Sequence, residues 1–569
     1  MEMKKRERII QTDVLIIGGG ISGLQAAIAA GEKGCKVIIS EKADTRRSGC
    51  GATGNDHFMC YIPECHGDDF DEILGEVCET VVGPRQDMNL LSRMLKRSFE
   101  MVQKWESYGI NMRPTGTWNF EGHALPERRR YHLKYDGHNQ KAMLTKKALE
   151  MGAEIYNKTT ITELLTKDNQ VIGAIGIHTK YDQPEMVIFH AKTVILVTGI
   201  TTRLYPGMNP AYVCNTSCNP ADAGGLAIAY RAGARMVNLD VLAGPAGPTQ
   251  FARAGKGTWI GVLSYPDGKP VGPFITKPTR ELGDVTTDIW LSVFDEKIAD
   301  GSGPVYMNCS VISDEDIAHM RKSFVSEGDT SINDYMDQFG IDFKKHMVEF
   351  SGYECILGGD SGIDIDINGE TSLKGLFSSG DVVGNVRGDI TSAAVFGQIV
   401  GENAADRCND SAYQRNLDAE YKFIETMPII QEKLDEYNAI LNRKIGAHWM
   451  EVNSTLQQIM DKYVSIRAIR SETLLTAGNK YLNNLKKYAL EQLKAENSHE
   501  LVRTLEVLDL LDVGIMLAMC GENRKETRGN HRRVDYPFTN PLLANKFQTI
   551  RLEDGKPVLE FRQRVRKSE

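Results

Sequence analysis

The chain of 569 residues lacks any uncharged apolar run of the roughly eighteen residues that a membrane-spanning helix needs. Its first ten residues, MEMKKRERII, are charged and lack the apolar core of a secretory signal. The eleven cysteines are scattered without a CxxC pair, and Cys214 and Cys218 form only a CxxxC. This predicts neither a disulfide framework nor ligands for an iron–sulfur cluster or another metal. We expect a soluble cytoplasmic protein with reduced thiols and no transmembrane segment.

An excess of positive charge is also missing. The chain carries 76 acidic against 67 basic residues, a net charge of −9, which argues against nucleic acid as a general partner. Hydrophobic residues make up 41% and charged residues 25%, as in ordinary globular proteins. The length is too great for one core and predicts two to four domains.

The most informative stretch that is present covers residues 12–41, TDVLIIGGGISGLQAAIAAGEKGCKVIISE. An apolar strand runs into the spacing Gly18-x-Gly20-x-x-Gly23 and an Ala-rich helix, and a second strand ends in Glu41. Gly18 permits a tight turn, Gly20 lets the backbone approach a pyrophosphate, and Gly23 lets helix and strand pack closely. The helix N-terminus offers N–H groups and partial positive charge to phosphates. Glu41 can accept hydrogen bonds from ribose hydroxyls, so the stretch predicts a Rossmann-like dinucleotide site.

Further motifs indicate a flavin dinucleotide rather than a nicotinamide. The small-residue loop RRSGCGATGN, residues 46–55, follows the second strand and could lie against an isoalloxazine ring. Asp381 ends the GLFSSGD segment and is placed to hydrogen-bond a ribityl hydroxyl. A helix starting near Ile390 would direct its positive end at the flavin N1/O2 edge and raise the flavin potential.

The composition and hydrophobic periodicity of successive segments predict an α/β fold in several domains. A Rossmann-like FAD-binding domain would comprise residues 1–237 and 359–412, interrupted by an α+β capping domain at 238–358, where Gly and Pro are dense. Periodic Leu-rich segments predict a helical domain at 413–520, followed by a C-terminal tail at 521–569.

Within the first domain, three runs alternate in hydrophobicity and predict antiparallel strands. They read AEIYNKTTITELL, VIGAIGIHT and MVIFHAKTVILVTG. The last part of the third run, Lys192 to Gly199, is continuously apolar and predicts a buried parallel strand that returns to the sheet.

Taken together, these residues resemble the flavoprotein subunits of the fumarate reductase and succinate dehydrogenase superfamily, most closely the adenylylsulfate (APS) reductase alpha subunit. The likeness extends over nearly the whole chain and rests on the order of GGGISGL, SG, DAGGLAIAYRAGA, GPVYMN, GLFSSGD and RKETR before RVDYP. It implies FAD as cofactor, a mobile capping domain, a small-molecule substrate, and electron exchange with a separate iron–sulfur (ferredoxin-like) subunit.

The motifs and the resemblance together give a set of expected cofactor-binding residues. They are Gly18, Gly20, Ile21, Ser22, Gly23, Glu41, Lys42, Ser48, Gly49, Gly51, Ala52, Thr53, Thr198, Gly199, Asp222, Asp381 and Ser392.

Two positions depart from the family pattern. The respiratory enzymes bond FAD covalently through a His that corresponds to Gly49, so the resemblance here implies non-covalent FAD, as in APS reductases. The substrate-binding His of the fumarate enzymes corresponds to Glu354, and the APS reductase GSHSG run corresponds to GGDSG at 358–362, with Asp360 for His. A carboxylate would repel a dianionic substrate, so the substrate stays open between fumarate-like, APS-like and other classes.

Five residues are candidates for the catalytic chemistry, which needs cations to hold the substrate and a proton source. Arg253 and Arg280 lie in Gly/Pro-rich loops of the expected capping domain and suit a carboxylate, sulfate or phosphate. Glu354 and Asp360 could act as acid or base if they face the flavin, and His138 falls where the family contacts flavin or substrate. The alternative for each is a structural role, such as capping a turn.

Basic residues also gather between positions 524 and 533, which we call the basic segment. They are Arg524, Lys525, Arg528, His531, Arg532 and Arg533. Either the basic segment is a solvated or subunit-facing patch, or one of its arginines reaches the active site or the iron–sulfur partner.

The leading functional hypothesis is an FAD-dependent oxidoreductase that serves as the catalytic flavoprotein subunit of a two-component system. No second GxGxxG for NAD occurs, so electrons would come from another protein or a free carrier. One alternative is a stand-alone soluble reductase or oxidase of the same fold, resembling L-aspartate oxidase. Another is a catalytically silent flavoprotein that acts as an electron conduit or assembly scaffold.

Overall fold

The computed structural model describes most of the chain. The residues outside the described part are 1, 53, 79–85, 122–128, 180–182, 207–223, 242–245, 250–257, 273–276, 281, 283–285, 287–289, 291, 327–329, 353–356, 411–414, 466–469 and 567–569.

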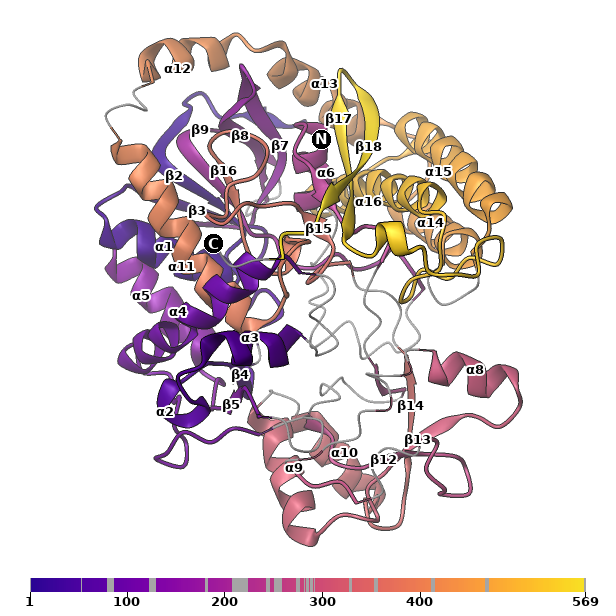
Figure 1. Ribbon diagram of the computed structural model, residues 1–569. Helices are drawn as coiled ribbons and strands as arrows, with labels where there is room; N and C mark the ends of the chain where they lie inside the picture. Colours follow the sequence, from indigo (N-terminus) through magenta and orange to yellow (C-terminus); the bar gives the residue numbers. More distant parts are fainter. Residues whose placement is uncertain are drawn as a thin grey trace.

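The nucleotide-binding unit forms the centre of an eight-stranded sheet (Figure 1). Strand β2 (Ile10–Ile17) pairs in parallel with β3 (Val37–Glu41) on one side and with β9 (Glu185–Leu196) on the other. Helix α1 (Ile21–Glu32) connects β2 to β3. The α/β fold with a Rossmann-like unit at its N-terminus, predicted from the sequence, is confirmed.

Strand β9 joins the parallel and the antiparallel parts of this sheet. Its C-terminal half pairs in parallel with β2, Val14 opposite Thr193, and with β16 (Leu376–Ser378). The parallel strand predicted from the apolar run at 192–199 is therefore confirmed. Its N-terminal half pairs antiparallel with β8 (Gln170–His178), which pairs with β7 (Thr159–Lys167). The short β1 (Lys4–Lys5) lies beside the start of β9.

The first of the three runs predicted as antiparallel strands is not one strand. Its beginning forms β6 (Glu154–Asn157), which pairs in parallel with β3 at the far edge of the sheet. Lys158, with a φ of 60°, turns the chain so that only the following residues enter β7. The prediction was wrong there because the alternation of side chains continues across the turn.

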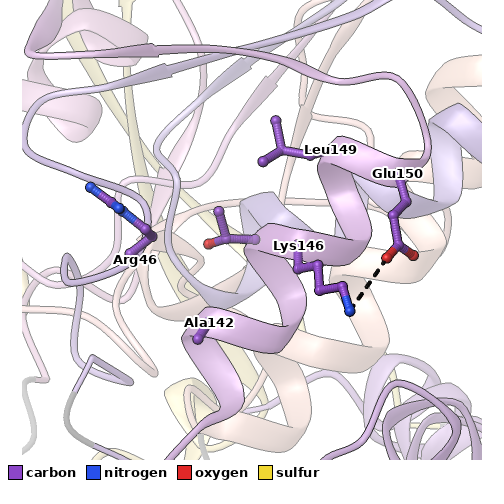
Figure 2. A pocket seen from close by; sticks show the side chains of 6 residues that line it. Arg46, Ala142, Lys146, Leu149 and Glu150 are labelled. Atoms are coloured by element: carbon purple, nitrogen blue, oxygen red, sulfur yellow. Dashed lines mark ion pairs between the residues drawn. The ribbon is translucent and has the colours of Figure 1, made fainter.

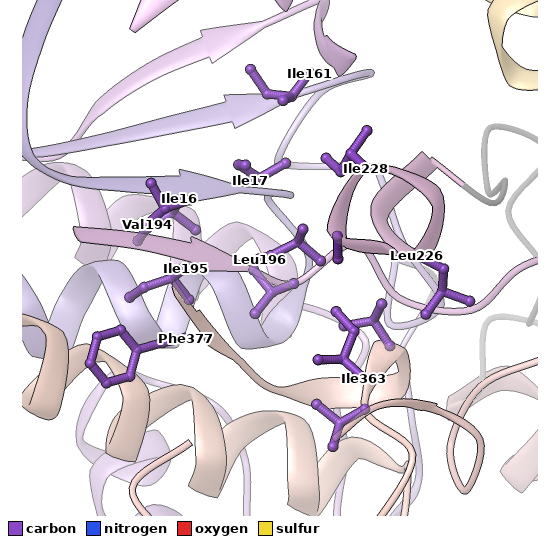
Figure 3. Close-up of a cluster of buried hydrophobic side chains, with 14 of the residues drawn as sticks. Ile16, Ile17, Ile161, Val194, Ile195, Leu196, Leu226, Ile228, Ile363 and Phe377 are labelled. Atoms are coloured by element: carbon purple, nitrogen blue, oxygen red, sulfur yellow. The ribbon is translucent and has the colours of Figure 1, made fainter. Parts of the chain in front are cut away.

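The main core lies between this sheet and helices from three parts of the sequence. Figure 3 shows Ile16 of β2 beside Val194 of β9, and Leu226 of helix α6 (Gly224–Arg231) at the other side of the same cluster. Helix α11 (Ile390–Asn409) packs on α1 with almost no space between their backbones, since a Cβ on Gly397 would lie 2.7 Å from the Ser22 carbonyl oxygen. The two helices run in the same direction, which brings their N-termini to the same edge of the sheet.

A second hydrophobic core lies within the region expected to form the capping domain. Trp259 is fully buried there, with ring centroids 5.0 Å from Phe324 and 5.3 Å from Phe350. Figure 1 shows this region at the end of the molecule opposite the C-terminal hairpin. Its elements are β11 (Ala246–Pro248), β12 (Val262–Ser264), α8 (Val293–Ala299), β13 (Val305–Asn308), α9 (Asp314–Ser326), α10 (Thr330–Phe339) and β14 (Val348–Gly352). The separate core supports an inserted domain, whose bounds remain a prediction.

The region expected to form the helical domain consists mainly of helices, and Pro428 begins the second of them. Its helices are α12 (Leu417–Glu425), α13 (Pro428–Asn442), α14 (Trp449–Tyr463), α15 (Glu472–Gln492) and α16 (Ser498–Asn523). None of the described helices of the chain is both long and apolar enough to cross a membrane.

The final segment is not an extended tail. It ends in a hairpin of β17 (Lys546–Glu553) and β18 (Lys556–Gln563), which follows the short 3₁₀ helix η6 (Pro541–Leu543). Strand β17 pairs with β10 (Met236–Val237), which pairs with β15 (Gly362–Ile363). The end of the chain is thus bound into the FAD-binding part of the molecule.

Helix α5 (Gln140–Glu150) packs on α1, and helix α4 (Met88–Ser107) packs on α11. The remaining described elements are β4 (His57–Met59), α2 (Pro63–His66), α3 (Phe70–Cys78), β5 (His132–Lys134) and the short 3₁₀ helix η4 (Gly380–Val382).

Candidate functional site

The three motif glycines have three different surroundings. Gly18 has a φ of 110°, and a Cβ there would lie 2.5 Å from the Val197 carbonyl oxygen. A Cβ on Gly23 would lie 1.9 Å from the Gly18 carbonyl oxygen, whereas a Cβ on Gly20 would meet nothing within 4 Å. These surroundings support a tight turn at Gly18, close packing at Gly23 and an open approach for a ligand at Gly20.

Glu41 ends β3 beside this glycine turn and is buried. Its carboxylate accepts hydrogen bonds from the backbone N–H groups of Gly19 at 2.7 Å and Ala43 at 2.6 Å. The ammonium of Lys141 donates to the Gly19 carbonyl oxygen at 2.5 Å. Lys42, the next cofactor candidate, instead forms an ion pair of 3.0 Å with Glu506 of α16. The turn is therefore held by two charged side chains, those of Glu41 and Lys141.

Four segments from distant parts of the sequence meet at this edge of the sheet. The hydroxyls of Ser22 and Ser379 are 2.5 Å apart. A Cβ on Gly49 would lie 3.5 Å from the Gly20 Cα, and one on Gly51 would lie 2.7 Å from the Ile21 side chain.

The remaining cofactor candidates of these segments lie close by. Ala52 donates its N–H to the Gly49 carbonyl oxygen at 3.1 Å. Gly199 follows Thr198 at the end of β9, and Thr198 packs against α6, where a Cβ on Gly225 would lie 1.9 Å from its hydroxyl. Ligands of open α/β sheets bind at this carboxyl edge of the parallel strands. Thr53 and Asp222 lie outside the described residues.

Four buried hydroxyls around this meeting point have no hydrogen-bond partner among the residues that the structure describes. They belong to Ser48, Ser361, Thr391 and Ser392. Leaving a buried hydroxyl without a partner costs about 1–3 kcal/mol, so buried polar groups in native proteins are almost always satisfied. FAD carries phosphate oxygens, ribose and ribityl hydroxyls and ring nitrogens in number, so these residues fit it.

Helix α11 begins at the same place. Its N-cap Asp389 accepts a hydrogen bond of 2.9 Å from the Ser392 N–H and forms an ion pair with Arg387. The helix end therefore combines a partial positive charge with an anchored carboxylate.

Three carboxyl groups lie close together beside this helix end. The loop at Asp360 packs on the loop at Asp381, because Gly359 donates its N–H to the Asp381 carbonyl oxygen at 2.8 Å. Asp360 is buried. Burial and the negative charges of Asp389 and Asp360 raise the pKa of Asp381 to about 6. Near neutral pH this carboxyl can therefore hold or release a proton.

The other catalytic candidates lie apart from this point or outside the described residues. Arg280 is held within the capping region by Asp316 and Glu315, each at 2.8 Å. His138 is exposed and pairs with Asp136 at 2.7 Å, beside Gly54, where a Cβ would lie 2.6 Å from the Ser326 carbonyl oxygen at the end of α9. Arg253 and Glu354 are not among the described residues.

Sequence reasoning missed several residues of this site. Arg387 and Thr391 flank the start of α11, and the sequence NVRGDIT directly before a predicted helix could have indicated them. The roles of Lys141 and Ser379 could not be predicted from the sequence. Their contacts, to the glycine turn and to α1, join distant parts of the chain.

Three of the six residues of the basic segment are buried, so the prediction of a solvated patch is wrong for Arg524, His531 and Arg533. Arg524 pairs with the buried Asp240 and, at 2.7 Å, with the buried Glu526. The Nη1 of Arg533 donates to the Gly521 carbonyl oxygen at 3.0 Å. Buried charges need such partners, and here the arginines find them within the protein rather than at a partner surface.

His531 is neutral within this network. Its Nδ1 accepts a hydrogen bond of 2.7 Å from the buried Arg470, and its Nε2 donates to the Arg524 carbonyl oxygen at 2.9 Å. Burial and the charge of Arg470 lower the pKa of His531 well below its usual value. The ring therefore acts as a fixed bridge between two arginines.

A surface hollow of about 510 Å³ lies on α5, close to the loop that follows β3 (Figure 2). Ala142, Lys146 and Leu149 follow one another at helical spacing along its wall. Its charged groups are paired, Lys146 with Glu150 at 3.9 Å and Arg46 with Asp44 at 2.9 Å. Among the described residues no group of three or more His, Cys, Asp or Glu side chains is arranged to hold a metal ion.

Comparison with known protein families identifies the dinucleotide that this chain binds. Residues 13–390 match the family model described as FAD binding domain, and residues 453–564 match the one described as Fumarate reductase flavoprotein C-term. The chain belongs to the FAD binding domain family. This flavoprotein is an FAD-dependent oxidoreductase with a C-terminal part like that of fumarate reductase flavoproteins, which confirms the resemblance to that superfamily and the cofactor expected from the sequence.

Relatives match this flavoprotein over almost its whole length. One subunit of the fumarate reductase (CoM/CoB) of Methanothermobacter marburgensis is 26% identical, covering 94% of this chain and 96% of the relative. L-aspartate oxidase of Vibrio cholerae is 23% identical, covering 93% and 97%. The structure of adenylylsulfate reductase from Archaeoglobus fulgidus superposes with a TM-score of 0.82 at 20% identity, covering 100% of this chain and 99% of that one. That likeness shows a common fold.

Proposed function

We propose that this flavoprotein is the catalytic subunit of a two-component oxidoreductase. Non-covalent FAD would exchange electrons with a small substrate and with a separate iron–sulfur subunit. The observation that carries the proposal is the pair of family matches, in the order FAD binding domain and then fumarate reductase flavoprotein C-terminus. The Methanothermobacter marburgensis relative, matched almost from end to end, is itself named as one subunit of a larger enzyme.

The residues at the carboxyl edge of the sheet would hold FAD in a definite order. The pyrophosphate would lie over Gly20 at the start of α1, with Glu41 toward the adenosine ribose. Asp381 and the start of α11 would lie toward the ribityl chain and the ring. When bound, FAD supplies a carrier that accepts and returns two electrons.

Gly49 supports non-covalent binding, because it offers no side chain that could bond to the ring. Precipitation of the purified yellow protein with acid tests this. We expect the yellow colour in the supernatant, and a yellow protein pellet would contradict the proposal.

The charge beside the start of α11 disfavours a dianionic substrate. Asp360, Asp381 and Asp389 gather there, and the Arg387 guanidinium is already paired with Asp389. We infer that a neutral, cationic or hydroxylated substrate fits better than fumarate or APS, with Asp360 as the proposed acid or base. Arg253, Arg280, Glu354 and His138 remain candidates for substrate contact.

Purification of the native protein together with its neighbours tests the two-component proposal. We expect an iron–sulfur protein to co-elute and to reoxidise the reduced flavin rapidly under anaerobic conditions. The reduced complex is then mixed with fumarate, APS and neutral enoates in turn. Elution of the flavoprotein alone, with no reoxidation by iron–sulfur proteins, would refute the proposal.

A stand-alone oxidase is the second candidate, favoured by the nearly complete match to L-aspartate oxidase. In that case the free flavoprotein would turn over L-aspartate with oxygen and release hydrogen peroxide. A silent electron conduit would instead reoxidise with carriers but with no organic or sulfur substrate. A cytoplasmic location, expected from the scattered cysteines, remains a prediction.

A further inference from the structure

Two cysteines that are far apart in the sequence lie near each other at the edge of the sheet opposite the proposed flavin site. Cys35 lies in the turn between α1 and β3, and Cys408 lies in the last turn of α11. The Cys35 Sγ lies 4.0 Å from the carbonyl oxygen of Ala405, which is one helical turn before Cys408. Because α1 and α11 pack backbone against backbone, the fold itself holds the two cysteines near each other.

The two thiols differ in exposure and in their neighbours. Cys35 is 8% exposed, and its Sγ lies 4.0 Å from the Ala405 carbonyl oxygen. Cys408 is partly exposed, with its Sγ 3.3 Å from the Thr193 hydroxyl and 3.4 Å from the Asp13 carbonyl oxygen. The ammonium of Lys192 lies beside them, paired with the Asp13 carboxylate at 2.7 Å.

These neighbours make the sulfur of Cys408 the more acidic of the two. The hydrogen bond from Cys35 lowers the pKa of Cys408, helped by the Thr193 hydroxyl and the Lys192 charge and opposed by burial and Asp13. The same hydrogen bond, together with burial, raises the pKa of Cys35. A thiolate stabilised by donors and a nearby cation, and reachable from solvent, is the reactive form of cysteine.

We propose that Cys35 and Cys408 form a redox-active dithiol that hydrogen peroxide converts reversibly into an intramolecular disulfide. Cys408 is the attacking thiolate and Cys35 is the resolving thiol. The proposal concerns the thiol pair alone and does not depend on the substrate or the partner of the flavin site.

The reaction balances in two steps. The Cys408 thiolate attacks one peroxide oxygen, the O–O bond breaks, and hydroxide leaves, so Cys408 becomes a sulfenic acid. The Cys35 sulfur then attacks the Cys408 sulfur, the S–O bond breaks, and the oxygen leaves as water while the S–S bond forms. Two thiols and one peroxide thus give one disulfide and two waters, and an added dithiol reverses the change.

The disulfide would join the C-terminal ends of α1 and α11, whose N-terminal ends border the proposed FAD site. A helix of 12 residues, such as α1, spans about 18 Å. The bridge therefore lies well away from the reacting end and would tie two helices together without entering the cofactor site.

Mass spectrometry of the intact FAD-loaded protein tests the proposal. The reduced protein is treated with equimolar peroxide, its remaining thiols are alkylated, and it is denatured and digested with trypsin. We expect peptide 34–36 to appear joined to peptide 408–415, lighter than the separate peptides by two hydrogen atoms. The joined peptide should disappear after dithiothreitol, and titration should show two thiols lost per chain.

Variants separate the roles of the two sulfurs. Cys35→Ser should stop at the sulfenic acid, which dimedone traps on Cys408, and Cys408→Ser should give neither product. Cys65→Ser removes an exposed thiol elsewhere and should form the joined peptide as fast as the wild type. The proposal would be overturned if peroxide oxidised Cys65 while Cys35 and Cys408 stayed reduced and were therefore alkylated. If Cys35→Ser does not fold, the joined peptide of the wild type decides the matter alone.

Discussion

The glycine turn at 18–23 and the basic segment at 524–533 achieve tight packing by opposite means. In the glycine turn the backbone itself makes the contacts, and a single added methyl on Gly23 would collide with the Gly18 carbonyl oxygen. In the basic segment, long charged side chains are buried and satisfied by carboxylates and carbonyl oxygens. The glycine turn leaves an open approach for a ligand at Gly20, whereas the basic segment packs its buried arginines against groups of the protein itself.

This difference shows that packing between residues close in sequence can be predicted from the sequence, whereas packing between distant residues cannot. The contact between Gly18 and Gly23 joins residues five positions apart, so their spacing in the sequence predicts it. The partners of Arg524 and His531 are Asp240 and Arg470, which come from other parts of the chain. The density of basic residues therefore predicted an exposed patch at 524–533, whereas the folded chain buries Arg524 and His531 beside partners from other parts of the sequence.

The largest expected effect comes from breaking the buried network. Arg524→Met leaves the buried carboxylates of Asp240 and Glu526 without their shared guanidinium. Removing one partner of a buried ion pair costs about 3–5 kcal/mol. We expect the free energy of unfolding, measured with urea, to fall by about that amount.

Arg551→Met is the matched control, because Arg551 pairs with Glu553 and Glu560 on the exposed hairpin. We expect a change below about 1 kcal/mol there. Equal effects of the two substitutions would mean that the basic segment contributes no more than a surface patch.

The next effect comes from adding one methyl group to the glycine turn. Gly23→Ala places a Cβ 1.9 Å from a backbone oxygen, so helix and strand must separate. Overpacking of this kind costs about 1–3 kcal/mol. We expect the FAD-free protein to lose that much stability in urea unfolding and to bind little FAD.

Gly20→Ala gives the opposite pattern, because its Cβ meets no protein atom within 4 Å. Gly20 is the N-cap of α1, where alanine is disfavoured, so the FAD-free protein should lose about 1 kcal/mol or less. We expect FAD affinity, measured by flavin fluorescence, to fall at least about tenfold because the methyl lies where the pyrophosphate approaches. Normal FAD binding by Gly20→Ala would place the pyrophosphate elsewhere.

The same distinction between local and distant contacts sets how far the sequence predicts the site. The glycine turn, Glu41, the parallel strand at 192–199 and the start of α11 were predictable, because periodicity and motif spacing are local. The division of β6 from β7 at Lys158 and the pairing of the C-terminal hairpin with β10 were not. The approach of Asp360 to Asp381 depends on loops that only the folded chain brings together.

The third effect concerns Asp381, a carboxyl whose local environment opposes its charge. Its pKa is raised to about 6 in the folded protein, so the folded state binds its proton more readily than the unfolded chain. The stabilisation is present below about pH 4 and is lost as the pH rises through 6. At pH 8 the raised pKa of Asp381 corresponds to a loss of about 3 kcal/mol of stability.

We therefore expect Asp381→Asn to raise the stability of the FAD-free protein by up to about 3 kcal/mol at pH 8 and to leave it unchanged near pH 4. Urea unfolding at both pH values measures this, with the exposed Asp68→Asn as control. FAD affinity should fall in the same variant, because the ribityl chain would lose a charged acceptor. A loss of stability at pH 8 would show that the carboxyl is favourably paired in the FAD-free protein.

The smallest effect tests a contact that is neither local nor fully buried. Glu121 accepts a hydrogen bond of 2.8 Å from His319, which lies on α9 of the capping region. Burial alone would raise the pKa of Glu121, but the hydrogen bond and charge of His319 outweigh it and lower that pKa. The contact is therefore present at neutral pH and is lost as the pH falls through the lowered value.

Glu121→Gln keeps the shape of the side chain and removes its charge. A partly exposed ion pair contributes about 1 kcal/mol or less, so the opening of the capping region should become up to about fivefold more frequent. Hydrogen exchange of the α9 amides at pH 7 measures this, and the difference from wild type should vanish at low pH. Glu64→Gln, on the exposed side of α2, is the control. Unchanged exchange at pH 7 would mean that apolar contact, rather than charge, holds α9 against the FAD-binding part of the molecule.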